Sequence, residues 1–531
     1  QKGLFLLITI MTGFFALLPL CDFQYYLAQG DHGRDLYCFQ QTMQGAMPYR
    51  DYSWVLGPLM PYYYSVFFTI FGVSAQSALL GQTFLAFIIG ITLYLTCSLF
   101  LSRPLSFIVA LFYWTFRGTE FFYTYVHIGG LAALMATIYF LLKYLKNNRA
   151  VHIYAGFLCL FILMLIRLNI GISSLVGFLA CLSLIDKFNK PANFKKNILR
   201  NLSISLGILA ATGIIYWILL KPLPSYALHQ CFPYSKSHRT DLSPSILGTL
   251  PLLWNFSIGF FTSSAAHSAF GLLTLFFIWL ASSVLSRNQI AASEKKENLL
   301  AISCLFIFLI LNLHEFILSG VYYRLNWIYP VFTLIIFFII HVGLKKTPSR
   351  LIHCLLLTTF IGGAFFHLHR QNFNIIASKG RHNILDIGKT KIYTWQTPDW
   401  FYAVYATTDF LNKNLAEDET FFALPFDPLY YFLTEKKSPT RQLIFFEHKN
   451  IPEEQELDII QKLETQKVNY IIISNRASSP GESLGILGRD YCPLLFKYIE
   501  ENFGVVTTIG EWARPAGWAW NHSIRILRRK F

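Results

Sequence analysis

Long apolar stretches separated by short polar turns recur along roughly the first two thirds of the chain. A helix that crosses a bilayer needs about 20 mostly apolar residues, and stretches of roughly this length predict about eleven transmembrane helices. Their approximate ranges are 3–21, 77–101, 105–116, 127–145, 151–167, 169–186, 201–220, 267–286, 298–314, 325–344 and 351–367. The pattern predicts a polytopic α-helical membrane protein.

The pattern changes after residue 367 to that of a soluble domain. The segments WFYAVYATTDFLNKNL and EEQELDIIQKLETQ have helical periodicity, whereas ETFFALP and VNYIIISN are typical of strands. Alternating helices and strands predict a small α/β domain. We therefore divide the chain into a transmembrane domain, 1–367, with an outer loop at 22–76, and a C-terminal α/β domain, 368–531.

Composition and charge support this division. The chain is 54% hydrophobic, 17% aromatic and only 14% charged, against about 25% charged in ordinary soluble domains. The net charge of +15 would favour nucleic acid as a partner in a soluble protein. Here the basic residues mark alternate turns, namely Arg103, Lys143, Lys146, Arg149, Lys187, Lys190, Lys195, Lys196, Arg200, Arg287, Lys295, Lys296, Lys345, Lys346 and Arg350.

This distribution follows the positive-inside rule, so it predicts a cytoplasmic N-terminus and a C-terminal domain on the outer, periplasmic side, and it excludes nucleic acid. The first apolar stretch also resembles a cleaved signal, because Lys2 precedes it and Cys21 ends it. Leu20, however, is not the small residue that such cleavage requires. We expect the first stretch to be a retained helix.

The outer loop opens with the polar cluster GDHGRD, Gly30 to Asp35, and continues with GAMPYRDY and GPLMPYYY. Two carboxylates and an arginine beside a bilayer are costly unless they meet a charged or hydroxylated ligand. The loop is therefore the candidate reaction centre.

The order of these parts resembles the GT-C superfamily of membrane glycosyltransferases, which take a sugar from a polyprenyl-phosphate carrier. The cluster with Asp31 and Arg34, together with PYRDY and GPLMPYYYSVFF, resembles the first loop of the family of protein O-mannosyltransferases and lipid A aminoarabinose transferases. That family often has Asp-Glu where this chain has Asp31-His32. Some members carry a lysine before the proline, where this chain has Gly57-Pro58.

The resemblance implies a polytopic, GT-C-like inverting glycosyltransferase at the outer face of a bacterial inner membrane. Its donor is a polyprenyl-phosphate sugar, and its acceptor is a glycolipid, lipid A, a polysaccharide or a protein. A carboxylate near the acceptor can remove its proton, so we expect Asp31 to be the base and Asp35 a second catalytic candidate.

The departing phosphate requires preorganised cations, and arginine suits its oxygens. The candidates for donor phosphate binding are Arg34, Arg117, Arg167 and Arg324. Further candidate substrate contacts are Tyr49, Arg50, Tyr62, His314 and Glu315.

Structural interpretations of these residues stay open. Arg34 follows Asp31 at a helical spacing, so the two residues could also form a structural ion pair that caps a helix. Three arginines lie at helix ends, namely Arg117, Arg167 and Arg324, and such positions are also typical of side chains that reach toward a membrane interface. The tyrosines of GPLMPYYY fit an aromatic belt, and His314 with Glu315 fits a salt bridge at the end of a loop.

His32 between two aspartates invites a metal interpretation, but the spacing matches no recognised site and the nine cysteines contain no CxxC pair. We predict no cofactor and no metal. A transporter or flippase of lipid-linked saccharide, and a glycan polymerase or ligase, are the alternative functions. The first-loop carboxylate and the outer α/β domain favour a transferase over a transporter.

Overall fold

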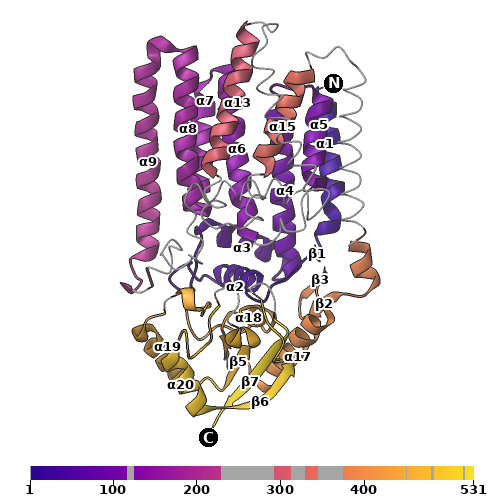
Figure 1. Ribbon diagram of the computed structural model, residues 1–531, viewed down its shortest axis with the longest axis vertical. Helices are drawn as coiled ribbons and strands as arrows, with labels where there is room; N and C mark the ends of the chain where they lie inside the picture. The colour runs from indigo at the N-terminus through magenta and orange to yellow at the C-terminus, as the bar shows by residue number, and fades with distance from the viewer. Residues whose placement is uncertain are drawn as a thin grey trace.

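In the computed structural model of the chain, the described residues are 2–116, 125–225, 227–228, 292–312, 329–344, 373, 375–449, 451–479, 484–517 and 521–530. A bundle of long helices forms one end of the molecule, and the C-terminal region, residues 375–530, forms the other (Figure 1). Helix α2 (Asp31–Met43) lies between these two parts (Figure 1).

The helices of the bundle form where the apolar stretches predict them. Their bounds are α1 (Lys2–Leu17), α4 (Ala75–Cys97), α5 (Arg103–Phe116), α6 (Tyr125–Asn147), α7 (Ala150–Ile166), α8 (Leu168–Asn189), α9 (Phe194–Leu220), α13 (Ala292–Asn312) and α15 (Tyr329–Leu344). The predicted spans 267–286 and 351–367 lie outside the described residues.

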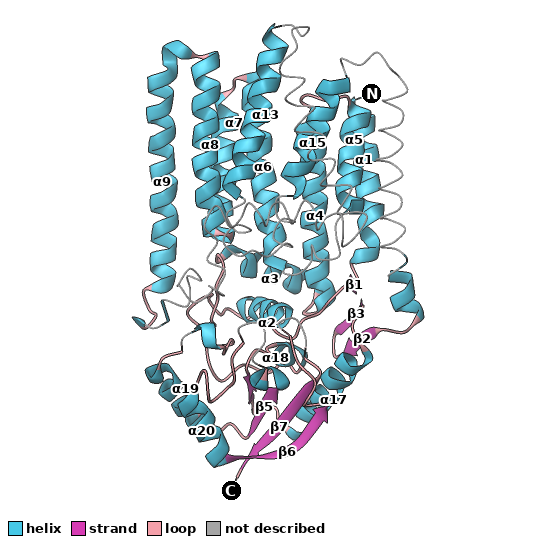
Figure 2. Cartoon of the chain, viewed as in Figure 1, coloured by secondary structure: helices cyan, strands magenta, loops and turns pink. Residues whose placement is uncertain are grey.

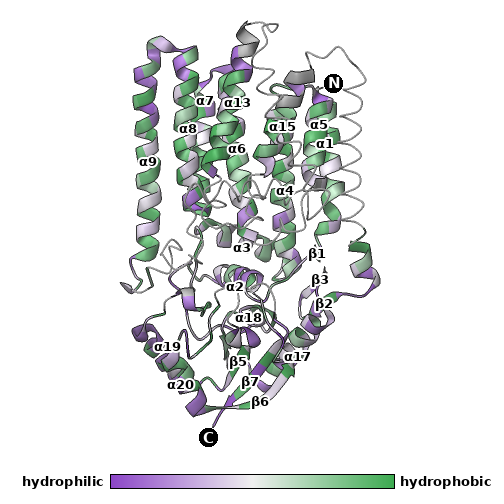
Figure 3. Cartoon of the chain, in the orientation of Figure 1, coloured by the Kyte–Doolittle hydropathy of each residue, from purple (hydrophilic) through white to green (hydrophobic). Residues whose placement is uncertain are grey.

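Hydropathy separates the two parts of the molecule. The bundle is mainly hydrophobic, whereas the C-terminal region carries more hydrophilic segments (Figure 3). Within the part of the chain that the structure describes, five helices are long and apolar enough to cross a membrane, and α7 is apolar but shorter. Because no water in a bilayer core satisfies backbone groups, such helices suit a spanning role. The protein is therefore a multi-pass membrane protein.

The C-terminal region contains a four-stranded mixed sheet in the order β4-β5-β7-β6. Strands β5, β7 and β6 lie side by side in Figure 2. Strands β4 (Phe421–Leu424) and β5 (Tyr470–Ser474) are parallel, whereas β6 (Phe503–Gly510) and β7 (Ser523–Arg529) join antiparallel. Helices α17 (Pro398–Asn414), α19 (Glu453–Thr465) and α20 (Pro493–Asn502) accompany the sheet. The strands ETFFALP and VNYIIISN fall on β4 and β5, and the two expected helices fall on α17 and α19.

A second sheet joins the start of the chain to the C-terminal region. The short strand β1 (Phe23–Gln24) pairs in parallel with β3 (Thr390–Thr394), which also pairs with β2 (Ile384–Ile387). Beyond this register, the backbone N–H of Trp395 donates to the carbonyl of Tyr25 at 3.1 Å. Segments about 370 residues apart in sequence are thus held side by side by main-chain hydrogen bonds.

Helices also form within the expected outer loop, where the sequence analysis assigned no secondary structure. They are α2 and α3 (Leu59–Phe71). Helix α2 is polar in sequence, yet Asp31 to Thr42 are all buried. Its polar residues are buried because α2 packs against α3 on one side and against the short helix α18 (Leu429–Leu433) of the C-terminal region on another. Neither contact is visible in local sequence periodicity.

Candidate active site

The charged cluster of the first loop lies at the beginning of α2. Gly30 is the residue before the helix, and Asp31 is the acidic residue of its first turn. A carboxylate at this end complements the positive pole of the helix macrodipole. The backbone N–H of Arg34 donates to the carbonyl of Gly30 at 2.7 Å and closes the first turn. One helical turn therefore brings Asp31, Arg34 and Asp35 together.

Arg34 pairs with both carboxylates of this cluster. Its Nη1 donates to Asp31 Oδ1 at 3.2 Å, while Nε and Nη2 donate to Asp35 Oδ1 at 3.0 and 2.7 Å. The exposed fraction of the side chain is 10% for Asp31 and 0% for Asp35. Removing one partner from a buried ion pair typically costs about 3–5 kcal/mol, because a charge stays unpaired. Asp31 is the more accessible of the two acids.

Burial changes the acidity of Asp35. Desolvation raises the pKa of Asp35 to about 6, although the charge and hydrogen bonds of Arg34 act in the opposite direction. Burial also disfavours the charged form of Arg34, but the attraction of Asp35 and Asp31 outweighs it and raises the pKa of Arg34. The cluster therefore holds a permanent cation between two acids in different environments.

His32 has a structural role in this turn. Its Nδ1 accepts from the backbone N–H of Ala28 at 3.0 Å, and its Nε2 lies 3.0 Å from the side-chain amide of Gln24. The ring also packs edge-on against Tyr125, with 5.5 Å between centroids. Both ring nitrogens are engaged in the protein, so His32 fixes the chain between β1 and α2.

The C-terminal region covers the start of α2. A Cβ added at Gly30 would lie 2.5 Å from the ring of Phe426, and one at Gly33 would lie 2.4 Å from the backbone nitrogen of Leu429. The backbone N–H of Leu429 also donates to the carbonyl of Gln29 at 3.1 Å. These glycines allow the two segments to approach more closely than side chains permit.

A buried polar network supports this cover from the carboxyl ends of β4 and β5. Asp427 accepts from Ser474 at 2.6 Å and from Asn521, and it lies 3.5 Å from Nη1 of Arg476. The side-chain amide of Gln29, two residues before Asp31, donates to Asn521 Oδ1 at 2.8 Å. The sequence analysis did not single out this network, which connects the C-terminal sheet to the first loop.

Gly57 is held against the end of α7. The indole of Trp54 donates to the carbonyl of Gly57 at 2.9 Å, and the N–H of Gly57 donates to the carbonyl of Ile166 at 2.9 Å. A Cβ at Gly57 would lie 2.2 Å from the carbonyl oxygen of Leu165, so no side chain fits there. The guanidinium of Arg34 lies 5.5 Å from the centre of the Trp54 ring. This packing explains why the loop has no lysine before Pro58.

The other first-loop candidates differ in exposure. Tyr49 is 1% exposed and its hydroxyl donates to the carbonyl of Leu56, so it supports the loop. Arg50 is half exposed and pairs with the neighbouring Asp51 at 2.7 Å. Tyr62 is 40% exposed on α3. Of these residues, Arg50 and Tyr62 are accessible to a ligand.

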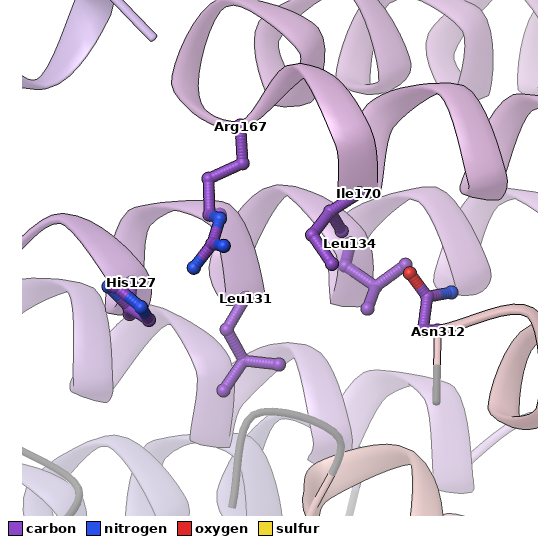
Figure 4. A pocket seen from close by; sticks show the side chains of 7 residues that line it. His127, Leu131, Leu134, Arg167, Ile170 and Asn312 are labelled. Atoms are coloured by element: carbon purple, nitrogen blue, oxygen red, sulfur yellow. The ribbon is translucent and has the colours of Figure 1, made fainter. Parts of the chain in front are cut away.

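Arg167 lines a small, mainly apolar pocket inside the bundle. It connects α7 and α8, and the pocket is lined by His127, Gly130, Leu131, Leu134, Arg167, Ile170 and Asn312. The side chain of Arg167 extends across the pocket toward the helix that carries His127 and Leu131 (Figure 4). The pocket thus places an arginine, a histidine and an amide among apolar side chains. Neither His127 nor Asn312 was a candidate from sequence.

Four of the candidates lie outside the described residues. They are Arg117, Arg324, His314 and Glu315. Lys449, in contrast, is a residue of the C-terminal region that the sequence analysis missed. Burial and the charge of Arg34 lower the pKa of Lys449 to about 8, while Asp31 acts in the opposite direction. As one lysine in the polar segment FFEHKN, it gives no signal in the sequence.

Comparisons with solved structures identify the fold. ArnT from Cupriavidus metallidurans, bound to undecaprenyl phosphate, is similar over 99% of this chain and 97% of its own, with 12% identity and a TM-score of 0.52. The oligosaccharyltransferase AglB from Archaeoglobus fulgidus, in complex with an inhibitory peptide and a dolichol-phosphate, covers 90% of this chain and 69% of its own. It has 10% identity and a TM-score of 0.44.

No protein-family model matches the chain. A search of curated proteins also found no match. The fold is therefore assigned from the similarity to ArnT, which extends over nearly the whole length of both chains. The chain therefore shares the fold of ArnT, in agreement with the GT-C-like fold that the resemblance implied.

Proposed function

We propose that the protein is an inverting glycosyltransferase that transfers a sugar from a polyprenyl-phosphate carrier to an acceptor at the outer face of a bacterial inner membrane. The observation that carries this proposal is the acid cluster at the start of α2. There Asp31 is held by the buried Arg34 beneath the C-terminal region. The GT-C fold supports the same class of reaction.

Asp31 is the proposed general base. In the transfer, the acceptor's hydroxyl or amine forms a bond to the anomeric carbon, and the bond from that carbon to the phosphate oxygen breaks. The acceptor's proton passes to Asp31, and the electron pair leaves with the carrier phosphate. Asp31 suits this role better than Asp35 because it is the more accessible acid. We assign Asp35 a positioning role, since it fixes Arg34 through two hydrogen bonds.

Arginines are the proposed ligands of the carrier phosphate. The guanidinium of Arg34 has five N–H donors, and three hydrogen bonds connect it to Asp31 and Asp35, so we propose that its other donors contact the phosphate. Arg167 offers a second guanidinium in a pocket between apolar helices, where a prenyl-linked anion has suitable surroundings. Arg117 and Arg324 complete the proposed set. Arg50, Tyr62, His314 and Glu315 are proposed to contact the sugar or the acceptor, with Tyr49 supporting their loop.

The acceptor class is a glycolipid, lipid A, a polysaccharide or a protein, and membrane lipid surrounds the bundle. A flippase that only moves a lipid-linked saccharide does not require a carboxylate such as Asp31 in a fixed position beneath the C-terminal region. The buried salt bridges of α2 support a rigid reaction centre instead, since catalytic groups need preorganised geometry. A polymerase or ligase would use the same chemistry on a longer donor.

The test is sugar transfer by membranes that contain the protein or its variants. Radiolabelled synthetic polyprenyl-phosphate sugars serve as donors, and extracts of envelope lipids, polysaccharides and proteins serve as acceptors. We expect Asp31→Asn to lower the rate by about 10²- to 10⁴-fold, the usual contribution of a general base.

The matched control is Asp22→Asn in the same loop. Asp22 pairs with Lys379 at 2.7 Å, but both side chains are about 40% exposed, and exposed pairs contribute little to stability. This variant should keep wild-type activity. Full transfer by Asp31→Asn would refute Asp31 as the base, and the absence of transfer by the wild type with every donor would refute the proposed reaction.

A further inference from the structure

The position of Asp31 depends on the short segment before it. Residues 26–30 form neither helix nor strand, and they connect β1 to the first turn of α2. Leu27 and Gln29 are both 0% exposed, and Gly30 has no side chain to cap the helix. A capping side chain usually satisfies the free N–H groups at a helix start. Tertiary contacts therefore fix the start of α2 instead.

The C-terminal region supplies such contacts. The side-chain amide of Gln396 donates to the carbonyl of Leu27 at 3.3 Å, and the backbone N–H of Leu429 donates to the carbonyl of Gln29 at 3.1 Å. The side-chain amide of Gln29 donates to Oδ1 and to the backbone carbonyl of Asn521, at 2.8 and 3.3 Å. Of these contacts, only the bond from Gln29 to Oδ1 of Asn521 joins two side chains, so it can be removed from either end by substitution.

Asp427 fixes the orientation of Asn521. One oxygen of Asp427 accepts from Nδ2 of Asn521, and the other accepts from Ser474 at 2.6 Å. Burial raises the pKa of Asp427, whereas Arg476 and these hydrogen bonds favour its ionised form. An ionised carboxylate only accepts, so the amide nitrogen of Asn521 faces Asp427 and its oxygen faces Gln29. The side chains are fully buried, where an unmade hydrogen bond costs about 1–3 kcal/mol. This network therefore has one preferred arrangement.

We propose that Asn521 is a positioning residue of the transfer reaction, which through Gln29 holds the first turn of α2 so that Asp31 reaches the acceptor's proton. This inference rests on the proposed function and adds a residue to it. Asn521 contacts no reacting atom. Catalytic groups need a geometry that is fixed to within about 0.5 Å, and a displacement of about 1 Å can lower a rate by about 10²-fold. Gln29 lies two residues before Asp31, so a shift of Gln29 displaces the carboxylate.

The experiment measures kcat and KM for sugar transfer, together with the melting temperature, in the same variants. Asn521→Ala removes the amide, and Gln29→Met removes the same hydrogen bond from the other end while Asp427 keeps its partners. We expect either variant to lower kcat by about tenfold to 10²-fold. KM for the donor should change little, because neither side chain binds substrate. Gln29→Met keeps the test decisive if Asn521→Ala does not fold.

The matched control is Ser523→Ala, two residues further along the chain. The hydroxyl of Ser523 donates to the carbonyl of Ile509 at 2.7 Å, and the side chain is as buried as that of Asn521. This bond joins β7 to β6 and does not lead to the first loop. Ser523→Ala should lower the melting temperature in detergent about as much as Gln29→Met does, but it should keep the kcat of the wild type.

A second background tests whether Asn521 acts through Asp31. A positioning residue has no further effect once the group that it positions is removed, so the two substitutions should not be additive. Asn521→Ala should therefore lower transfer in the wild type but leave the residual rate of Asp31→Asn unchanged. A residue that only stabilises the fold would lower the rate in both backgrounds.

The outcomes separate the two proposals. Suppose that Asp31→Asn lowers transfer, but that Asn521→Ala and Gln29→Met keep the wild-type kcat or lower the rate equally in both backgrounds. Asn521 then does not position Asp31, although Asp31 remains the base. If Asp31→Asn keeps full activity, the base assignment is wrong and the role of Asn521 falls with it.

Discussion

Both acids of the α2 cluster are buried, but the side chain of Asp31 keeps an exposed fraction of 10% and that of Asp35 keeps none. Asp35 receives two hydrogen bonds from Arg34 on a single oxygen, while Asp31 receives one. Two carboxylates in different environments divide their roles, because burial favours the protonated form and pairing favours the charged form. The pair Asp35–Arg34 therefore acts as a support for Asp31.

This arrangement predicts a pH-dependent stability. The pKa of Asp35 is raised from 3.8 to about 6, so the native state binds its proton more tightly than the unfolded chain does. Stability from this group is present below about pH 4 and is lost as the pH rises through about 6. The melting temperature of the wild type in detergent should therefore fall from pH 5 to 7 relative to that of Asp35→Asn. Parallel melting profiles for the two proteins would contradict this prediction.

Helix α2 is a polar helix that is enclosed on several sides. It packs against α3 of the membrane part and α18 of the C-terminal region, and a Cβ at Gly33 would lie 2.4 Å from the backbone nitrogen of Leu429. Interiors at this density do not absorb an added methyl group without a shift of the backbone. The spacing between α2 and α18 therefore depends on Gly33, which has no Cβ.

Gly33→Ala should destabilise the protein by about 1–3 kcal/mol, the usual cost of overpacking. It should also lower transfer activity, because α2 moves away from its cover. The measurements are thermal unfolding in detergent and the sugar-transfer assay.

Gly207→Ala on α9 is the control, since nothing lies within 4 Å of a Cβ at Gly207. We expect it to leave stability unchanged or slightly higher, because alanine is the better helix former. Equal melting temperatures for Gly33→Ala and Gly207→Ala would show that the contact with Leu429 has no energetic weight.

The whole molecule is a membrane bundle joined to a C-terminal region through the first loop. The contacts that join them include three around the start of α2, namely the β1–β3 pairing, the packing of α2 on α18, and the hydrogen bond from Gln29 to Asn521. All three involve residues within a short stretch before and in α2. Any movement of the C-terminal region would therefore change the surroundings of Asp31 and Arg34.

The proposed topology predicts which residues react from outside the cell. Lys413 on α17 has a side chain that is 71% exposed, and Lys146 lies at the end of α6 near α13, 2.7 Å from Glu297. A membrane-impermeant maleimide should label Lys413→Cys in intact spheroplasts, and it should label Lys146→Cys only after permeabilisation. The wild type gives the background from native cysteines. The reverse pattern would place the C-terminal region in the cytoplasm.

Local patterns in the sequence were sufficient for the helices of the bundle and for α17, α19, β4 and β5. Apolar length and periodicity depend only on neighbours in the chain, so each of these elements is readable without the fold. The cluster Asp31, Arg34 and Asp35 was also recognisable, since one turn of helix joins all three. The GT-C resemblance followed from about the same residues.

Only the tertiary structure decided which groups meet across long sequence separations. Helix α2 is polar in sequence, and part of its burial comes from α18, almost 400 residues later, as the contact of Gly33 with Leu429 illustrates. In the sequence, Lys449, Asp427 and Arg476 are ordinary polar residues. Their importance appears only in the fold, where the segments that follow β4 and β5 lie near the first loop. Electrostatic partnership depends on distance and burial in space, and neither quantity is encoded in local periodicity.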